Sequence, residues 1–218
     1  VSWEVGFLHK AKRVKETDHL HYIEMAKGPQ GRPEWAQAPP YCWRVGVPGL
    51  ARTLAASGMG LNAAFFLITN TVLFGFLVAL WVYLRDLGFE LPFRVTGLLL
   101  LGLTQGAVRW FEWQYWMTDP ACLFLVALAF LFIHRRQTLA LVLVSLVAAF
   151  VRETYVIVYP YYFFRQIRSG VSFGRALVRT LTVAALPTLA LMALRIAIWP
   201  SLADDWWSGI TDSMAFRF

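Results

Sequence analysis

The sequence predicts an all-α fold, a polytopic bundle of transmembrane helices, and three observations support this prediction. Hydrophobic residues make up 58% of the 218 residues and charged residues only 15%, which is more apolar surface than a soluble domain of this size buries. The stretch from Met59 to Leu84 carries no charged residue. The arginines gather in short loops between apolar segments, as is typical of the cytoplasmic side of membrane proteins.

The predicted spans follow one another along the chain. Met59 to Leu84 is long enough to cross a hydrocarbon core of about 30 Å at about 1.5 Å per residue. The shorter segments, Val95 to Val108 and Pro120 to Ile133, need snorkelling arginines or local thinning of the bilayer to cross it. Thr180 to Trp199 is the last predicted span, and Pro187 is expected to kink it because proline removes a backbone hydrogen bond.

Thr138 to Phe164 is predicted to fold back on itself as a short helix pair. The basic loops on either side, around Arg135 and from Arg165 to Arg179, both belong on the cytoplasmic side, so two crossings separate them. Each arm then has about 13 residues, or about 20 Å of helix, which is too short for a full bilayer. The bend, with Arg152 and Glu153 at its tip, is expected in a polar pocket below the outer surface. An ordinary interfacial salt bridge at a helix end is the alternative.

The chain divides into three predicted parts. Residues 1–58 are an irregular extracytoplasmic segment, either a loop or an amphipathic stretch. Residues 59–199 form the transmembrane domain with about six spans, and 200–218 are an extracytoplasmic tail. Because the chain begins with valine and stops abruptly, we expect that a further spanning segment precedes it. The net charge of +7 and the basic cluster at residues 10–15 are explained by solvated or lipid-facing stretches, so no nucleic-acid partner is expected.

Few residues have the spacing of a metal or redox site. Cys42 and Cys122 lie far apart and lack the spacing of a zinc site, so we expect two ordinary buried thiols. Carboxylate and imidazole groups at Asp18, His19 and His21 ligate divalent cations in other proteins, but no matching ligand set follows in the sequence. We therefore predict a plain polar loop and no metal site, with a divalent cation as the alternative.

Three polar residues on the predicted outer side are candidates for chemistry. Asp18 lies in the segment before the first span and is a candidate general base. Asp119 closes the aromatic stretch RWFEWQYWMTDP, which is typical either of a membrane-interface belt or of a wall against a sugar or lipid headgroup. Arg195 near the end of the last apolar segment either snorkels to the outer interface or faces the pocket, where it helps Arg152 to neutralise a phosphate.

The order of these motifs resembles the first half of bacterial integral-membrane glycosyltransferases of the GT-C type. The resemblance covers residues 16–165 and is carried by TDHLHYIEMAKG with PPYCWRVGVPGLARTLA, then TDPACLFLVALAF, then AAFVRETYVIVYPYYFF. Such enzymes transfer a sugar from a polyprenyl-phosphate carrier to an acceptor on the outer side of the membrane. The resemblance implies a lipid-linked sugar as donor, surrounding membrane lipid, and a location in the bacterial inner (plasma) membrane.

The resemblance also implies roles for individual residues. Asp18 takes the place of the catalytic carboxylate, and Asp119 takes the second acidic position. Arg152 matches the arginine that meets the carrier phosphate, which suits a guanidinium because it stays charged and binds phosphate bidentately. Glu153 is expected to hold Arg152 in place, and Arg44 is expected to support the segment of Asp18.

Two other classes of function stay open. Gly97, Gly102 and Gly106 make one helix face small, as in close-packed membrane interfaces, which is consistent with a noncatalytic subunit of a larger membrane complex. A transporter also has broken helices near charges, but no pair of repeat halves is visible. The enzyme hypothesis predicts that the candidate acids and arginines converge on one outward-facing cavity, whereas the subunit hypothesis predicts that they pair off separately.

Overall fold

The computed structural model describes residues 18–31, 41–103, 111 and 114–198. Over these residues the chain is all-helical, as the sequence predicts, and contains no strand. The 3₁₀-helices are η1 (Gly28–Gln30), η2 (Tyr41–Trp43) and η4 (Glu153–Ile157). The α-helices of the described part are α2 (Asp18–Lys27), α4 (Gly46–Ala56), α5 (Leu61–Asp86), α6 (Leu91–Leu103), α8 (Asp119–His134), α9 (Thr138–Ala149), α10 (Val158–Arg168) and α11 (Phe173–Ile198).

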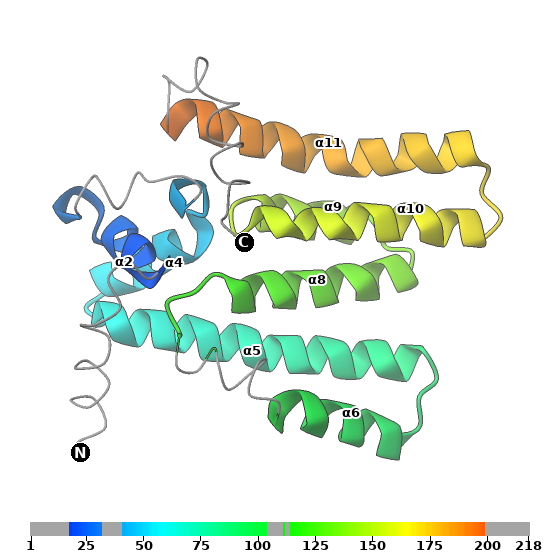
Figure 1. Cartoon of the computed structure of the whole chain (residues 1–218), viewed down its shortest axis with the longest axis horizontal. Coiled ribbons are helices and arrows are strands. Elements are labelled where there is room, and N and C mark those ends of the chain that lie inside the picture. The colour runs from blue at the N-terminus through cyan, green and yellow to red at the C-terminus, as the bar shows by residue number, and fades with distance from the viewer. Residues whose placement is uncertain (1–17, 32–40, 104–110, 112–113, 199–218) are drawn as a thin grey trace, which may run out of the picture.

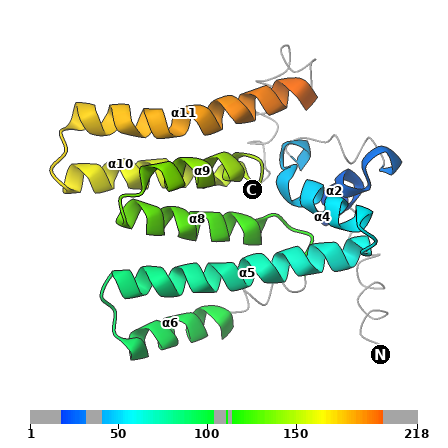
Figure 2. The same cartoon turned by 180° about the vertical axis from the view of Figure 1, so that it is seen from behind.

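The longer helices lie side by side with roughly parallel axes (Figures 1 and 2). α5 packs against α8, α8 packs against α9 and α10, and α9 and α10 pack against α11. α6 lies outside α5, while α2 and α4 gather at one end of the bundle, beside the start of α5. We call this the α2–α4 end. The opposite end holds the α5–α6, α8–α9 and α10–α11 turns, and we call it the basic end.

Among the described helices, two are long and apolar enough to cross a membrane, namely α5 and residues Phe173–Ala197 of α11. Large apolar side chains stay exposed along both, among them Phe74, Leu181 and Leu189. Helices that are apolar all round are typical of membrane spans or of deeply buried cores. Three more apolar helices are shorter, namely α6, α8 and α9 with 13, 16 and 12 residues.

α9 and α10 are the antiparallel arms of a hairpin, which confirms the fold-back predicted for Thr138 to Phe164. The bend passes through Arg152, whose backbone is extended (φ −166°, ψ 135°), and then through η4. The bend lies next to α2 and α4, and α5 extends further toward this end of the bundle than the bend does (Figure 1). The backbone N–H of Gly46 donates a hydrogen bond to the carbonyl oxygen of Phe150 at 2.7 Å, which joins the start of α4 to this bend.

Two segments differ from the prediction. The expected basic loop from Arg165 to Arg179 is helical except at residues 169–172, because Gly170, with φ +84°, allows a tight turn between α10 and α11. The segment before residue 59, predicted to be irregular, is largely helical where it is described. α4 is an amphipathic helix that buries Val47 and Ala51, and this buried face stabilises it against its neighbours.

Small residues let the central helices approach closely. α8 buries Ala121, Ala127 and Ala129 in the bundle. In α5, a Cβ atom added at Gly75 would lie 2.9 Å from the ring of Phe124 in α8. Such contacts are typical of helix interfaces in membrane bundles, where close packing replaces the hydrophobic effect as the driving force.

Gly46→Ala is expected to destabilise the protein by about 1–3 kcal/mol, because the added Cβ would lie 3.0 Å from the carbonyl oxygen of Phe150. Gly49 in the same helix has nothing within 4 Å of an added Cβ, so Gly49→Ala is expected to be neutral or slightly stabilising. Thermal unfolding of the two purified variants measures the difference. Equal melting temperatures would show that the contact between α4 and the bend contributes nothing.

Candidate functional site

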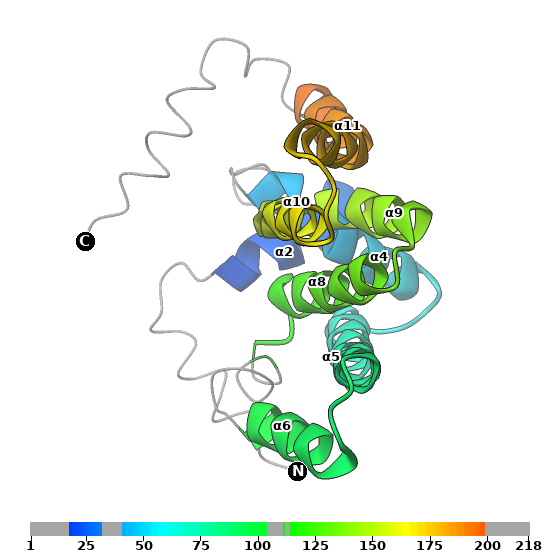
Figure 3. The ribbon, with the colours of Figure 1, turned by 90° about the vertical axis from the view of Figure 1, so that its right-hand side faces the viewer.

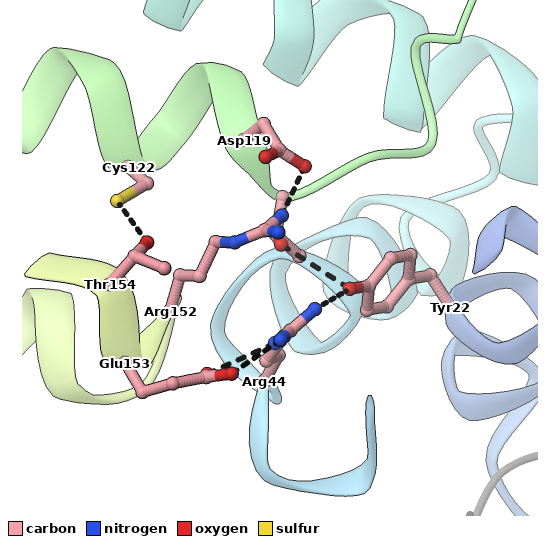
Figure 4. Close-up of polar contacts among 8 residues, drawn as sticks. Tyr22, Arg44, Asp119, Cys122, Arg152, Glu153 and Thr154 are labelled. Atoms are coloured by element: carbon pink, nitrogen blue, oxygen red, sulfur yellow. Dashed lines mark hydrogen bonds and ion pairs between the residues drawn. The ribbon is translucent and has the colours of Figure 1, made fainter. Parts of the chain in front are cut away.

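Charged side chains from four parts of the chain meet near the α2–α4 end. We call them the charged cluster, which consists of Arg44, Asp119, Arg152, Glu153 and Arg195. Arg44 follows η2, Asp119 begins α8, Arg152 and Glu153 form the bend, and Arg195 lies in the last turn of α11. Figure 4 shows the first four of them with their polar contacts.

Arg152 is paired with Asp119. Its Nη1 donates a hydrogen bond to Oδ2 of Asp119, and the two side chains are 19% and 28% exposed. Asp119 is the first residue of α8, where the helix dipole also favours a carboxylate. Asp119 therefore fixes the guanidinium of Arg152 at the N-terminal end of α8, and part of the arginine side chain stays accessible.

Arg44 is paired with Glu153 and buried. Its Nε donates to Oε2 of Glu153 at 3.1 Å and its Nη2 donates to Oε1, while Nη1 donates to the hydroxyl of Tyr22 at 2.8 Å. Only 6% of Arg44 is exposed, and Tyr22 is fully buried. The Thr118 hydroxyl lies 3.5 Å from the same tyrosine oxygen. These bonds join α2, the start of α4, the start of α8 and the bend.

The pairing corrects one expected role. Glu153 was expected to hold Arg152, but it binds Arg44, and Asp119 holds Arg152. The reason is the extended backbone at Arg152, because successive side chains of an extended chain point to opposite sides. Figure 4 shows the two neighbours diverging toward different partners.

Arg195 packs against the inside of the bundle. Its guanidinium carbon lies 4.1 Å from the ring centroid of Trp43, which precedes Arg44. The Nε of Arg195 and the Nε1 of Trp43 are buried and have no hydrogen-bond partner among the described residues. The guanidinium therefore lies over Trp43, and its predicted role beside Arg152 at a phosphate stays a prediction.

Asp18 is the first residue of α2, one turn before Tyr22, and its side chain lies outside the described residues. The tail at 200–218, the basic cluster at 10–15 and Gly106 lie outside them as well. Of the aromatic stretch, the described Trp116 stacks on His19 with ring centroids 5.1 Å apart.

The histidines and cysteines of the described part form no metal site. No group of three His, Cys, Asp or Glu side chains lies close enough there to hold a metal ion. His21 lies in α2 rather than in the predicted loop, and it stacks on Tyr41 at 4.1 Å. Cys42 and Cys122 are free and buried, as predicted, and burial raises the pKa of Cys42 to about 11. Its thiolate is therefore scarce at neutral pH.

The ion pair between Arg44 and Glu153 is buried on the arginine side and partly exposed on the glutamate side. Burial lowers the pKa of Arg44, and the hydrogen bond to Glu153 more than reverses this effect, so Arg44 stays charged at neutral pH. The charged cluster has three guanidinium groups and two carboxylates, so it carries excess positive charge.

An apolar hollow of about 620 Å³ lies directly beside the bend, between α4, α5, α8 and α9. Its lining consists of apolar residues and extends to Phe150 and Val151, the two residues before Arg152. Leu50, Val72 and Phe124 also line it. The charged cluster and the apolar hollow therefore adjoin only through the backbone before Arg152. None of the five residues of the charged cluster lines this hollow, which is apolar and so differs from the polar pocket predicted at the bend.

Tyr22, Thr118 and Trp43 have no role in the prediction from the sequence, although Tyr22 belongs to the polar segment of Asp18. That segment was predicted to be a loop, so the spacing of four residues between Asp18 and Tyr22, one helical turn, was no signal. Thr118 directly precedes Asp119, and Trp43 directly precedes Arg44. Their position next to a predicted site residue was the signal in the sequence for both.

Glu153→Gln is expected to lower the melting temperature at pH 7, because a neutral amide in place of the carboxylate leaves the buried guanidinium of Arg44 without its counter-charge. Melting curves of both proteins at pH 7 measure the difference. Exposed Glu90 offers the control, since Glu90→Gln removes the same charge in the α5–α6 turn. Equal effects of the two substitutions would contradict the prediction.

The arrangement is suited to one kind of ligand in particular. Excess guanidinium charge next to an apolar hollow matches an amphiphile that carries an anionic headgroup and a hydrocarbon chain. No protein-family model, curated protein or solved structure matches the chain. Function is therefore inferred from the charged cluster, the apolar hollow and the resemblance in motif order.

Proposed function

We propose that this chain belongs to a membrane glycosyltransferase of the GT-C type, which transfers a sugar from a polyprenyl-phosphate carrier to an acceptor on the outer side of the membrane. The observation that carries the proposal is the position of the apolar hollow, whose lining ends at Val151, next to Arg152 of the charged cluster. A polyprenyl phosphate has an anionic group for the first and a hydrocarbon chain for the second.

The proposed arrangement in the membrane has about six spans, including the α9–α10 pair, in a bacterial inner membrane. The basic end faces the cytoplasm, since arginine-rich turns stay on that side. The α2–α4 end then faces outward. Because α9 and α10 have only 12 and 11 residues, their bend lies below the outer surface, where the covering α2 and α4 keep the polar residues away from lipid.

In the proposed reaction, the hydroxyl oxygen of the acceptor attacks the anomeric carbon of the sugar. The bond from that carbon to the phosphate oxygen breaks, and the carrier phosphate leaves with the electron pair. Asp18 accepts the hydroxyl proton as general base. Arg152, held by Asp119, and Arg195 neutralise the charge that develops on the phosphate oxygens. Arg44 and Glu153 hold the bend in position.

Binding of a short carrier analogue tests the proposal. Farnesyl phosphate should bind the purified chain more tightly than farnesol, which has the same hydrocarbon chain without the phosphate. Arg152→Gln should weaken farnesyl phosphate binding by about 10-fold to 100-fold, the effect of losing a hydrogen bond to a charged group, and leave farnesol binding unchanged. Titration followed by intrinsic tryptophan fluorescence measures both affinities.

The matched control is Arg52→Gln, an exposed arginine of α4 outside the charged cluster, which should bind both ligands like the original chain. Equal affinity for farnesyl phosphate and farnesol would contradict the proposal. An equal loss in the Arg52 and Arg152 variants would do so too, because it would indicate attraction by the overall charge only.

A noncatalytic subunit of a larger membrane complex is the second candidate. It is favoured by the complete pairing of Asp119 and Glu153 with arginines, which needs no ligand. The described part of α6 also contacts mainly α5 and exposes Phe93, Leu99 and Leu103, a face that another membrane chain would cover. Under this hypothesis, Phe93→Lys would break a complex isolated from native membranes, while Arg152→Gln would leave farnesyl phosphate binding unchanged.

A further inference from the structure

A second group of charges lies at the basic end, away from the charged cluster. Five exposed arginines of the α8–α9 and α10–α11 turns and of the helix ends beside them form what we call the basic patch, namely Arg136, Arg165, Arg168, Arg175 and Arg179. Figure 3 views the molecule from this end. The α10–α11 turn and the α8–α9 turn both face the viewer.

The described carboxylates at this end do not neutralise the basic patch. Asp86 accepts hydrogen bonds from Arg135 at 2.6 Å and from Arg85 at 3.4 Å, so it is already engaged. Glu90 is exposed in the α5–α6 turn. The five arginines of the basic patch form no ion pair with any described residue, so their donors face solvent or another molecule.

Two of these arginines are in unfavourable positions in α11. Arg175 lies in the first turn of α11, where the helix dipole favours anions and disfavours cations, and Arg179 lies one turn later. They are also spaced i, i+4, so the like charges repel. Neither residue therefore stabilises its helix by its charge. A bound anion would reverse both effects, since it would lie between the two guanidiniums and near the positive end of the dipole.

Apolar side chains surround the basic patch. Phe164 in the second half of α10 and Phe173 at the start of α11 are each 66% exposed, and Val178 is 63% exposed. Arginine beside exposed phenyl rings matches the boundary of a membrane leaflet, where anionic headgroups lie next to hydrocarbon. A soluble acidic protein or a nucleic acid would leave these rings in water, so the lipid is the better match.

We propose that the basic patch binds anionic phospholipid headgroups of the leaflet at the basic end. The proposal does not depend on the sugar-transfer hypothesis, because none of its residues belongs to the charged cluster. The binding orders Arg175 and Arg179 around a headgroup phosphate and fixes the α10–α11 turn at the membrane surface.

Short-chain lipids added to the purified full chain in a neutral detergent test this proposal. Dioctanoyl phosphatidylglycerol should bind at least about 10-fold more tightly than dioctanoyl phosphatidylcholine, and raised salt should reduce the difference. Arg175→Gln/Arg179→Gln should remove most of the preference. The change relieves repulsion within α11, so the variant is expected to fold. Lys27→Gln/Arg52→Gln removes the same charge at the opposite end and should keep the preference.

Native mass spectrometry counts the bound lipids, and tryptophan fluorescence gives the affinities. Equal binding of the two lipids would overturn the proposal, and so would an unchanged preference in the Arg175/Arg179 variant. Poly-glutamate is added as a soluble competitor. If it binds the patch as tightly as the anionic lipid does, then the partner is an acidic protein segment and the lipid proposal is wrong. Farnesyl phosphate binding should be the same in both double variants, which separates this test from that of the proposed function.

Discussion

Arg44→Met is expected to lower the free energy of unfolding by about 3 kcal/mol, or roughly 6–12 °C in melting temperature for a chain of this size. The guanidinium of Arg44 is 6% exposed and bonds to Glu153 and to Tyr22, so its loss leaves a carboxylate and a hydroxyl without a donor. Glu153 is 34% exposed, so water partly replaces the lost bonds. The expected loss therefore lies at the low end of the values for broken buried pairs.

A double-mutant cycle separates the pair from its surroundings. Arg44→Met/Glu153→Leu replaces both charges by apolar groups and should be more stable than Arg44→Met alone, because no unpaired charge is left buried. Thermal unfolding in one detergent, with unfolding of the secondary structure followed by circular dichroism, measures all four proteins. Additive effects of the two substitutions would show that the contact between Arg44 and Glu153 contributes little, contrary to the geometry.

Asp18→Asn is expected to reduce sugar transfer by about 100-fold or more, the usual contribution of a positioned general base, without lowering expression or the melting temperature. Asparagine is nearly the same size and keeps a hydrogen-bonding oxygen, but it does not accept the proton of the acceptor hydroxyl. Asp18 begins α2, and Tyr22 one turn later is bonded to Arg44, so α2 is tied directly to the bend that carries Arg152.

The assay supplies a panel of radiolabelled prenyl-phosphate sugars to membranes that contain the expressed chain and its native acceptors. Asp18→Asn should still bind farnesyl phosphate with unchanged affinity, because the phosphate is assigned to Arg152 and not to Asp18. Glu24→Gln, two residues after Tyr22 in α2 and not part of the charged cluster, is the matched control. Undiminished sugar transfer by Asp18→Asn would exclude Asp18 as the general base. Loss of farnesyl phosphate binding in the same variant would indicate a structural role for Asp18.

Much of the helical architecture follows from the sequence, because it depends on local properties. Apolar length predicted the helix at 59–84, where α5 covers Leu61–Asp86, and the one at 120–133, where α8 covers Asp119–His134. The break at Arg152 followed from the arginines on either side of an apolar stretch, since both basic turns had to lie at the same end. Charge and hydrophobicity are read directly from residue types, so no tertiary information was needed.

Only the tertiary structure decided which charges pair. Arg44 and Glu153 are 109 residues apart in sequence, and Arg152 and Asp119 are 33 apart, so no local period relates them. The partners were set by the extended backbone at Arg152, which turns the side chains of Arg152 and Glu153 to opposite sides, and by the packing of α2 and α4 over the bend. A sequence lists the charges, but a pair forms only where folding brings both groups to one place in the right orientation.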